Sequence, residues 1–171
     1  RCGAIARFSP IMRAVSEAAR AGKLVIGTCN GFQILCEAGL LPGALVRNRS
    51  LHFVCEIPTM RVEANDSPFL HGLPIGTLLR LPIAHGEGCY FADEATLRDL
   101  NDRGQVLLRY CDAAGRITAA ANPNGSLEKL AALLHRGRRV LGLLTPPAPP
   151  RGKQLGSRGG RNTPHPLRAP H

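Results

Sequence analysis

Residues 23–38 read KLVIGTCNGFQILCEA and contain the strongest structural signal in the chain. Lys23–Thr28 is a short apolar run typical of a buried strand, and Asn30–Ala38 has the apolar spacing of a helix that ends at Gly39. Cys29 stands between them, which leaves no room for a loop. A strand that turns directly into a helix exposes its corner residue and aims the helix N-terminal amides at it. The stretch therefore predicts a sharp corner with Cys29 at its tip.

The segments around this corner alternate between helix and strand signals. Ser9 and Pro10 are typical of a helix start and Gly22 of a helix end. Asp93 is a capping residue for a second helix that runs to about Asp102. A third helix is expected over 127–134. Strands are expected over 51–63, where Pro58 implies a bulge or an edge strand, and over 78–83, 105–111 and 140–144. Such alternation is typical of an α/β protein, and we expect a three-layer sandwich with a mostly parallel central sheet.

The net charge of +10 on 171 residues suggests nucleic-acid binding at first sight, but the charge is unevenly placed. Residues 145–171 hold five of the 22 basic residues, seven of the 14 prolines and no acid. The rest of the chain is only mildly basic, and an aromatic content of 4% argues against an RNA-stacking surface. Residues 145–171 also lack hydrophobic periodicity, so we predict a disordered tail there and no nucleic-acid partner.

Several other classes are disfavoured by the sequence. It contains no apolar run long enough to span a membrane, and its first residues, RCGAIAR, lack the apolar centre of a secretory signal. The six cysteines are widely spaced, which favours reduced thiols and a cytoplasmic protein. No Cys-x-x-Cys pair or His/Cys ligand spacing is present, so no metal site is expected.

The predicted corner has the residues for nucleophilic catalysis. A thiolate at Cys29 would be stabilised by the positive end of the following helix, and the backbone N–H of Asn30 would face a developing oxyanion. The competing interpretation is a buried structural cysteine. A cysteine nucleophile needs a base and an acid to orient it. Among the six histidines, spacing alone favours His85 with Glu87, and the alternative for this pair is the anchoring of a loop.

The motif GTCNGFQ at 27–33 resembles the nucleophile motif of class I glutamine amidotransferases. Its Asn-Gly-Phe form is similar to that of the glutaminase subunits of phosphoribosylformylglycinamidine synthase. Further segments are similar to that family: RCGAIA at 1–6, RNRSLHFVC at 47–55, PIAHGEG at 82–88, RYCD at 109–112 and NPNGS at 122–126. The resemblance covers residues 1–144.

The resemblance implies glutamine hydrolysis through a thioester on Cys29 with Asn30 as backbone oxyanion donor. It places Gln33, Asn48 and Phe53 at the glutamine pocket. The ammonia would pass to a large synthetase subunit that uses ATP and magnesium to make formylglycinamidine ribonucleotide in purine biosynthesis, with a small accessory subunit in the same complex. No cofactor is expected in this chain.

Two departures from the family pattern stand out. The family carries its catalytic His and Glu in a Pro-His-Pro-Glu motif after a strand like Val140–Leu144, whereas here TPPAPP follows. We therefore expect both residues to be absent, and the resemblance assigns His85 and Glu87 to a separate loop. TPHPL at 163–167 echoes the motif without its acid. The chain also starts after the family's opening strands and the Gly-Gly loop that supplies a second oxyanion donor.

These departures lead us to expect a partial amidotransferase domain over 1–144 that lacks its first strands and is inactive as it stands. For residues 145–171 we hypothesise a shifted reading frame. Two alternatives remain: a catalytically dead module that docks to the synthetase, and another class I glutaminase. Nucleic-acid binding through the basic tail is disfavoured as a biological role.

Overall fold

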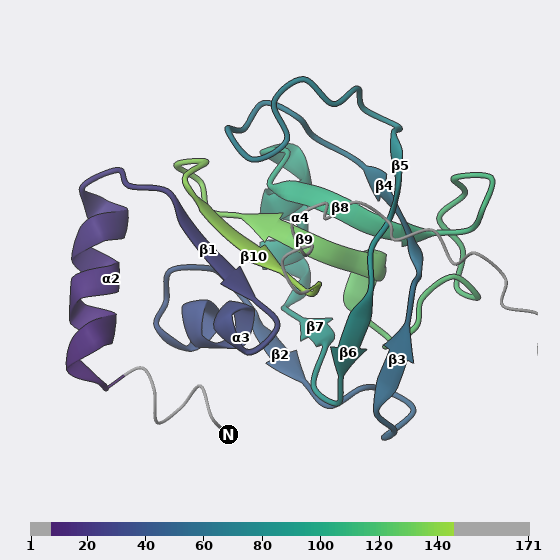
Figure 1. The fold of residues 1–171 in the computed structure, drawn as a ribbon, viewed down its shortest axis with the longest axis horizontal. Coiled ribbons are helices and arrows are strands. Elements are labelled where there is room, and N and C mark those ends of the chain that lie inside the picture. The colour runs from purple at the N-terminus through teal and green to yellow at the C-terminus, as the bar shows by residue number, and fades with distance from the viewer. Residues whose placement is uncertain (1–7, 146–171) are drawn as a thin grey trace, which may run out of the picture.

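A computed structural model describes residues 8–145, and Figure 1 shows the arrangement of its elements. The helices are α2 (Pro10–Arg20), α3 (Asn30–Glu37) and α4 (Glu94–Asp102), with a 3-10 turn, η1 (Leu127–Lys129). The strands are β1 (Val25–Thr28), β2 (Ala44–Val46), β3 (Val54–Glu56), β4 (Thr59–Val62), β5 (Leu78–Arg80), β6 (Ile83–His85), β7 (Cys89–Phe91), β8 (Val106–Cys111), β9 (Leu130–Leu134) and β10 (Val140–Leu143).

Six of these strands form the main sheet, in the order β1-β10-β9-β8-β4-β5. Two short antiparallel ribbons, β2–β7 and β3–β6, lie beside it. In Figure 1, α4 lies behind β8 and β9, while α3 contacts β1, β10 and β2. Helices against a curled mixed sheet confirm the expected α/β fold class.

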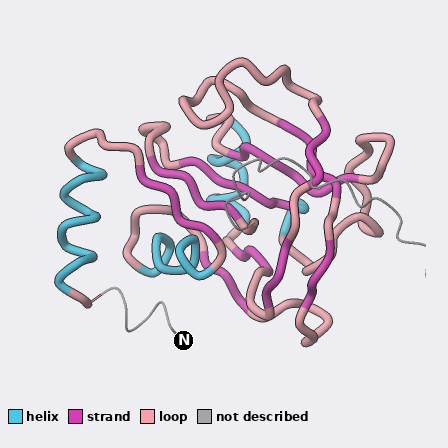
Figure 2. The backbone as a smooth tube through the Cα atoms, viewed as in Figure 1, coloured by secondary structure: helices cyan, strands magenta, loops and turns pink. Residues whose placement is uncertain are grey.

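The expectation of a mostly parallel sheet is wrong for the described residues. Only β1 and β10 pair in parallel, and the other four neighbouring pairs of the main sheet are antiparallel. Parallel pairing needs a crossover connection, which is usually a helix. Here β9 and β10 are joined by the short turn 135–139, and the connections from β4 to β5 and from β8 to η1 are loops, as Figure 2 shows.

Most of the elements near the corner lie where the sequence predicts them. Helices α2, α3 and α4 are found as expected, and the Asp93 carboxylate caps α4 by accepting a hydrogen bond from the Thr96 amide at 2.7 Å. The expected strands 51–63 and 78–83 are each divided, at Pro58 and at Pro82. Proline has no N–H for a sheet hydrogen bond, which accounts for both interruptions. The short strands β2 and β7 were not expected.

The helix expected over 127–134 is wrong, because residues 130–134 form strand β9. The sequence LAALL has high helix propensity, but all five of its side chains are buried between β8 and β10. A central strand buried on both faces also has a continuous apolar sequence. Burial in the sheet therefore overrides the local preference for helix.

Helix α3 is held close to the sheet by a glycine on β10. A Cβ built on Gly142 would lie 2.2 Å from the Phe32 ring and 2.7 Å from Leu41. Phe32 is fully buried and stacks on Tyr90 of β7, with ring centroids 6.2 Å apart. These contacts fix α3, and with it Cys29 at its N-terminus, relative to β10 and β7.

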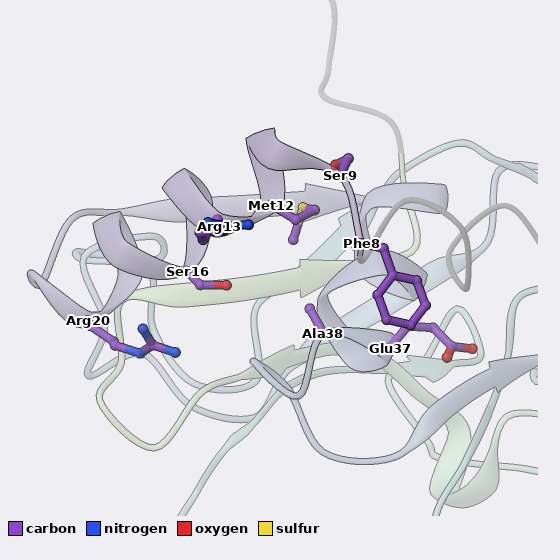
Figure 3. Close-up of a pocket in the computed structure, with 8 residues that line it drawn as sticks. All are labelled: Phe8, Ser9, Met12, Arg13, Ser16, Arg20, Glu37 and Ala38. Atoms are coloured by element: carbon purple, nitrogen blue, oxygen red, sulfur yellow. The ribbon is translucent and has the colours of Figure 1, made fainter.

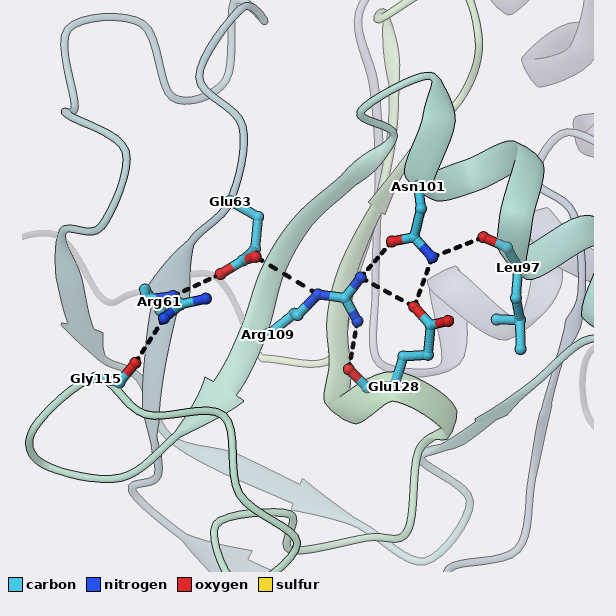
Figure 4. Close-up of polar contacts among 7 residues, drawn as sticks. All are labelled: Arg61, Glu63, Leu97, Asn101, Arg109, Gly115 and Glu128. Atoms are coloured by element: carbon cyan, nitrogen blue, oxygen red, sulfur yellow. Dashed lines mark hydrogen bonds and ion pairs between the residues drawn. The ribbon is translucent and has the colours of Figure 1, made fainter.

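A polar network around Arg109 ties together α4, β4, β8 and η1, as drawn in Figure 4. Arg109 on β8 is 11% exposed and lies between the carboxylates of Glu63, at 3.6 Å, and Glu128, at 3.0 Å. It also donates to the Glu128 carbonyl and to the side chain of Asn101. Arg61 extends the network by pairing with Glu63 at 2.7 Å.

Several expectations concern residues beyond the described range. The tail at 145–171 and the motif echo at 163–167 lie outside it, apart from Thr145, which is buried. Within residues 8–145, no helix has both the length and the apolar character that a membrane span requires. The same residues contain no group of three or more His, Cys, Asp or Glu side chains that could hold a metal ion.

Candidate functional site

Cys29 forms the corner between β1 and α3, and its backbone is strained there. Its φ of 52° and ψ of −111° place a non-glycine residue in a conformation that glycine adopts most easily. Its amide donates to the Leu143 carbonyl at the end of β10, at 2.8 Å, and its carbonyl accepts from the Phe32 amide at 3.0 Å. The corner is thus held from both sides, and such strain at a fixed corner is common at functional sites.

The two glycines that flank this corner have different roles. A Cβ on Gly27 would lie 2.6 Å from the backbone of Gly31 and 2.5 Å from Leu35, so β1 approaches α3 too closely for any side chain. A Cβ on Gly31 would meet nothing within 4 Å. The backbones of β1 and α3 are therefore in close contact at Gly27, whereas Gly31 faces open space.

Cys29 opens into a cavity of about 440 Å³. Its walls come from the corner, from the first turn of α3, from the residue before β3, and from the end of β6 with the loop that follows it. The lining residues are Cys29, Asn30, Gln33, Phe53, Ala84, His85, Gly86 and Glu87. The Cys29 thiol points toward the Ala84 carbonyl oxygen, 3.9 Å away. The structure thus brings the predicted residues Cys29, Asn30, Gln33 and Phe53 together around one space.

Gln33 and Glu87 join the two walls of this cavity. The Gln33 side chain is 3% exposed and donates from Nε2 to Oε2 of Glu87 at 3.1 Å. Glu87 is exposed, and it is the only acidic residue among those that line the cavity, which include no lysine or arginine. Sequence reasoning considered Glu87 only as a partner of His85, whereas the structure pairs it with Gln33.

Asn48 lies behind the cavity wall and does not line the cavity. It is fully buried, and its side-chain amide donates to the carbonyl oxygens of His52 and His85, each at 2.8 Å. Its Oδ1 accepts from the Gly88 amide at 2.9 Å, and its backbone amide donates to the Gly86 carbonyl. Asn48 thus makes three hydrogen bonds to the segment 85–88, and in this structure it positions those residues.

His85 is also part of the scaffold of the loop. It is 3% exposed, and its Nε2 lies 3.1 Å from the side-chain nitrogen of Asn124. Since Asn124 Oδ1 accepts from the Ser126 amide, the NH₂ group of Asn124 faces His85 and donates to Nε2. This geometry places the ring proton on Nδ1, which is buried without a partner in the described structure. Burial lowers the pKa of His85, so the ring is neutral near pH 7.

The pairing of His85 and Glu87 as base and orienting acid has no support in this geometry. No hydrogen bond joins His85 to Cys29 among residues 8–145, and the side chain of Glu87 binds Gln33 instead of the His85 ring. Asn124, which supports His85, belongs to the NPNGS motif, but its contact to His85 was not expected. A buried asparagine in a turn-rich segment gives no sequence signal for a partner 39 residues away.

Another cavity, of about 400 Å³, lies between α2 and the end of α3 (Figure 3). Its walls are residues of α2 and the segment before it, together with Glu37 and Ala38. None of the residues labelled in Figure 3 is a cysteine or a histidine. The cavity at Cys29 is therefore the better candidate for a covalent reaction.

Comparison with known proteins gives consistent matches. A family profile described as a CobB/CobQ-like glutamine amidotransferase domain matches residues 4–150. The phosphoribosylformylglycinamidine synthase subunit PurQ of Gloeobacter violaceus is 55% identical over 161 residues, covering 94% of this chain and 69% of the relative. The same subunit of Thermosynechococcus vestitus is 58% identical over 147 residues, covering 86% of this chain and 61% of the relative.

A solved structure is similar as well. The chain matches one titled "Structure of PurLQS from Thermotoga maritima" with a TM-score of 0.73 and 39% identity, over 85% of this chain and 61% of that one. The chain thus spans about two thirds of the length of the proteins that it matches.

Proposed function

This chain belongs to the CobB/CobQ-like glutamine amidotransferase family, in its PurQ group, and we propose that it is the glutaminase part of a phosphoribosylformylglycinamidine synthase. One observation carries the proposal: Cys29 stands at a strained strand–helix corner that opens into a cavity lined by Gln33 and Glu87. The product ammonia would be used by the synthetase in de novo purine biosynthesis.

The chemistry assigned to Cys29 is acyl transfer. The Sγ atom attacks the carboxamide carbon of glutamine, ammonia leaves, and water then hydrolyses the thioester to glutamate and free thiol. During both steps the negative charge on the carbonyl oxygen is stabilised by a backbone N–H at the start of α3, which we assign to Asn30. Gln33 and Phe53 would contact the rest of the substrate, and Asn48 would hold the loop that faces it.

We further propose that turnover is slow for the 171-residue chain. Among residues 8–145, no base is hydrogen-bonded to Cys29, and a cysteine nucleophile without one loses orders of magnitude in rate. Ammonia release from glutamine tests this: the 171-residue chain alone should release no more ammonia than its Cys29→Ala variant. Release that depends on Cys29 would show that the chain has a working base.

The partners follow from the same family assignment. We propose a large synthetase subunit that holds ATP and magnesium, which makes the complex a carbon–nitrogen ligase, and a small accessory subunit. No cofactor is assigned to this chain. We propose the cytoplasm as the compartment, because a catalytic thiol at Cys29 and the other free thiols of the described residues suit reducing conditions.

The proposed function is tested by a diazoketone analogue of glutamine, 6-diazo-5-oxo-L-norleucine, with peptide mass spectrometry to locate the label. Cys29 should react, while Cys55, an exposed free thiol on β3, should not. Labelling of Cys55 at the same rate as Cys29 would contradict a glutamine site at the corner.

The alternative is a catalytically dead module that docks to the synthetase, and the lack of a base at Cys29 in the described residues favours it. Under this alternative the chain co-purifies with the large subunit, but the glutamine analogue does not label Cys29. Co-purification together with selective labelling of Cys29 supports the glutaminase.

A further inference from the structure

The cavity at Cys29 contains one carboxylate whose role the chemistry at the thiol does not explain. Of the eight lining residues, Glu87 is the only acid, none is a lysine or arginine, and the His85 ring is neutral because burial lowers its pKa. One oxygen of Glu87, Oε2, accepts from Gln33. The other oxygen has no hydrogen-bond partner among residues 8–145, which leaves it available to a ligand in the cavity.

The backbone on both sides of Glu87 is fixed. The Gly86 carbonyl accepts from the Asn48 amide at 2.9 Å, and the Gly88 amide donates to Asn48 Oδ1 at 2.9 Å. The Gly88 carbonyl accepts from the side chains of Asn124, at 2.8 Å, and Ser126, at 3.1 Å. A Cβ on Gly88 would lie 2.0 Å from the His85 ring, so the loop is closely packed beneath Glu87. The carboxylate is thus preorganised at the cavity.

Glutamine carries two charged groups on its α-carbon, an ammonium and a carboxylate. When its carboxamide carbon is at the Cys29 thiol, its α-nitrogen lies about 5 Å further along an extended side chain. A carboxylate attracts the ammonium and repels the α-carboxylate, so it fixes which of the two faces the loop. Gln33 holds the carboxylate in place through its amide and leaves its own Oε1 as a second acceptor.

We propose that Glu87, held by Gln33, binds the α-ammonium group of the substrate and makes the site selective for a free amino acid over an N-acylated or peptide-bound glutamine. This inference rests on the proposed glutaminase function and adds the substrate feature that the site recognises. Glu87 is a specificity-determining residue here and takes no part in proton transfer to Cys29.

The test compares two electrophiles on the full 171-residue chain: 6-diazo-5-oxo-L-norleucine and its N-acetyl derivative, which lacks the ammonium. Wild-type Cys29 should react about tenfold faster with the free amino acid, the factor expected for loss of one charge-assisted hydrogen bond. Glu87→Gln should bring the two rates together, and Glu87→Asp should keep part of the difference. Iodoacetamide labelling of Cys29 should be the same in all variants.

The matched control is Glu17→Gln, which removes an exposed carboxylate of α2 and should leave the selectivity at its wild-type value. If Glu87 only held Gln33 in place, Glu87→Gln would keep the selectivity, because a glutamine at position 87 can still accept from Gln33. Retained selectivity in Glu87→Gln would therefore overturn the inference and leave the proposed function standing.

The two electrophiles also test the inference on the wild-type chain, without any variant. Equal rates of Cys29 with the two electrophiles would overturn the inference even if Glu87→Gln failed to fold. No labelling of Cys29 by either electrophile, with normal labelling by iodoacetamide, would contradict the proposed function and the inference together.

Discussion

The strain at Cys29 predicts an unusual order of stability among its variants. At φ 52° and ψ −111° a side chain at this corner costs about 1–3 kcal/mol, and Cys29→Ala keeps that cost while Cys29→Gly removes it. Glycine adds about 0.5–1 kcal/mol of unfolded-state entropy. The thiol contributes little of its own, since its one hydrogen-bond contact is 3.9 Å long. Cys29→Gly should therefore be more stable than Cys29→Ala by about 0.5–2 kcal/mol.

Urea unfolding of the two 171-residue variants, followed by circular dichroism, measures this difference from the two midpoints at a common slope. The control is Ala14→Gly, at an exposed position inside α2, where the order reverses and glycine should cost about 0.5–1 kcal/mol. If Cys29→Ala were as stable as Cys29→Gly, or more stable, the result would refute backbone strain at position 29.

Three further predictions concern the scaffold. Gly27→Ala should destabilise the fold by at least about 2 kcal/mol, because the new Cβ would lie 2.6 Å from the backbone of Gly31. Gly31→Ala should leave the free energy of unfolding unchanged or raise it by up to about 1 kcal/mol, and the urea midpoints of the two variants measure the difference. Burial lowers the pKa of His85 below its ordinary 6.5, so below that pH the unfolded chain binds a proton that the folded chain does not. The free energy of unfolding should therefore fall as the pH drops below about 6.5, by up to about 1.4 kcal/mol per pH unit. His85→Asn should abolish this dependence on pH. Arg109→Gln should cost about 2–3 kcal/mol, because it removes the charge of Arg109 from between the carboxylates of Glu63 and Glu128. Arg98→Gln, at a pair exposed to solvent, should leave the thermal midpoint unchanged, and equal effects of the two variants would contradict the network.

Local signals in the sequence were sufficient where the backbone obeys local rules. Asp93 and Ser9–Pro10 marked helix starts, and the abrupt change from strand to helix located Cys29 at its corner. Proline at 58 and 82 divides strands because of its missing N–H; at Pro58 the sequence predicted an irregularity, a bulge or an edge, although not two separate strands. These features depend on a few neighbouring residues, which is why one sequence reveals them.

Features set by distant contacts were not accessible in this way. LAALL at 130–134 is a strand only because β8 and β10 bury it on both sides. The mixed sheet reflects connections that return as turns and loops, which the alternation of elements did not reveal. At the site, Asn48 was assigned to the glutamine pocket, and the structure places it behind the loop that it holds, with contacts to residues up to 40 positions away.

The most direct test of the central claim is protection of Cys29 by glutamine. The full chain is treated with iodoacetamide with and without glutamine, and the labelling rates of Cys29 and of exposed Cys55 are read by peptide mass spectrometry. The account predicts that glutamine slows the labelling of Cys29 and leaves Cys55 unchanged. Equal labelling of Cys29 with and without saturating glutamine would contradict it.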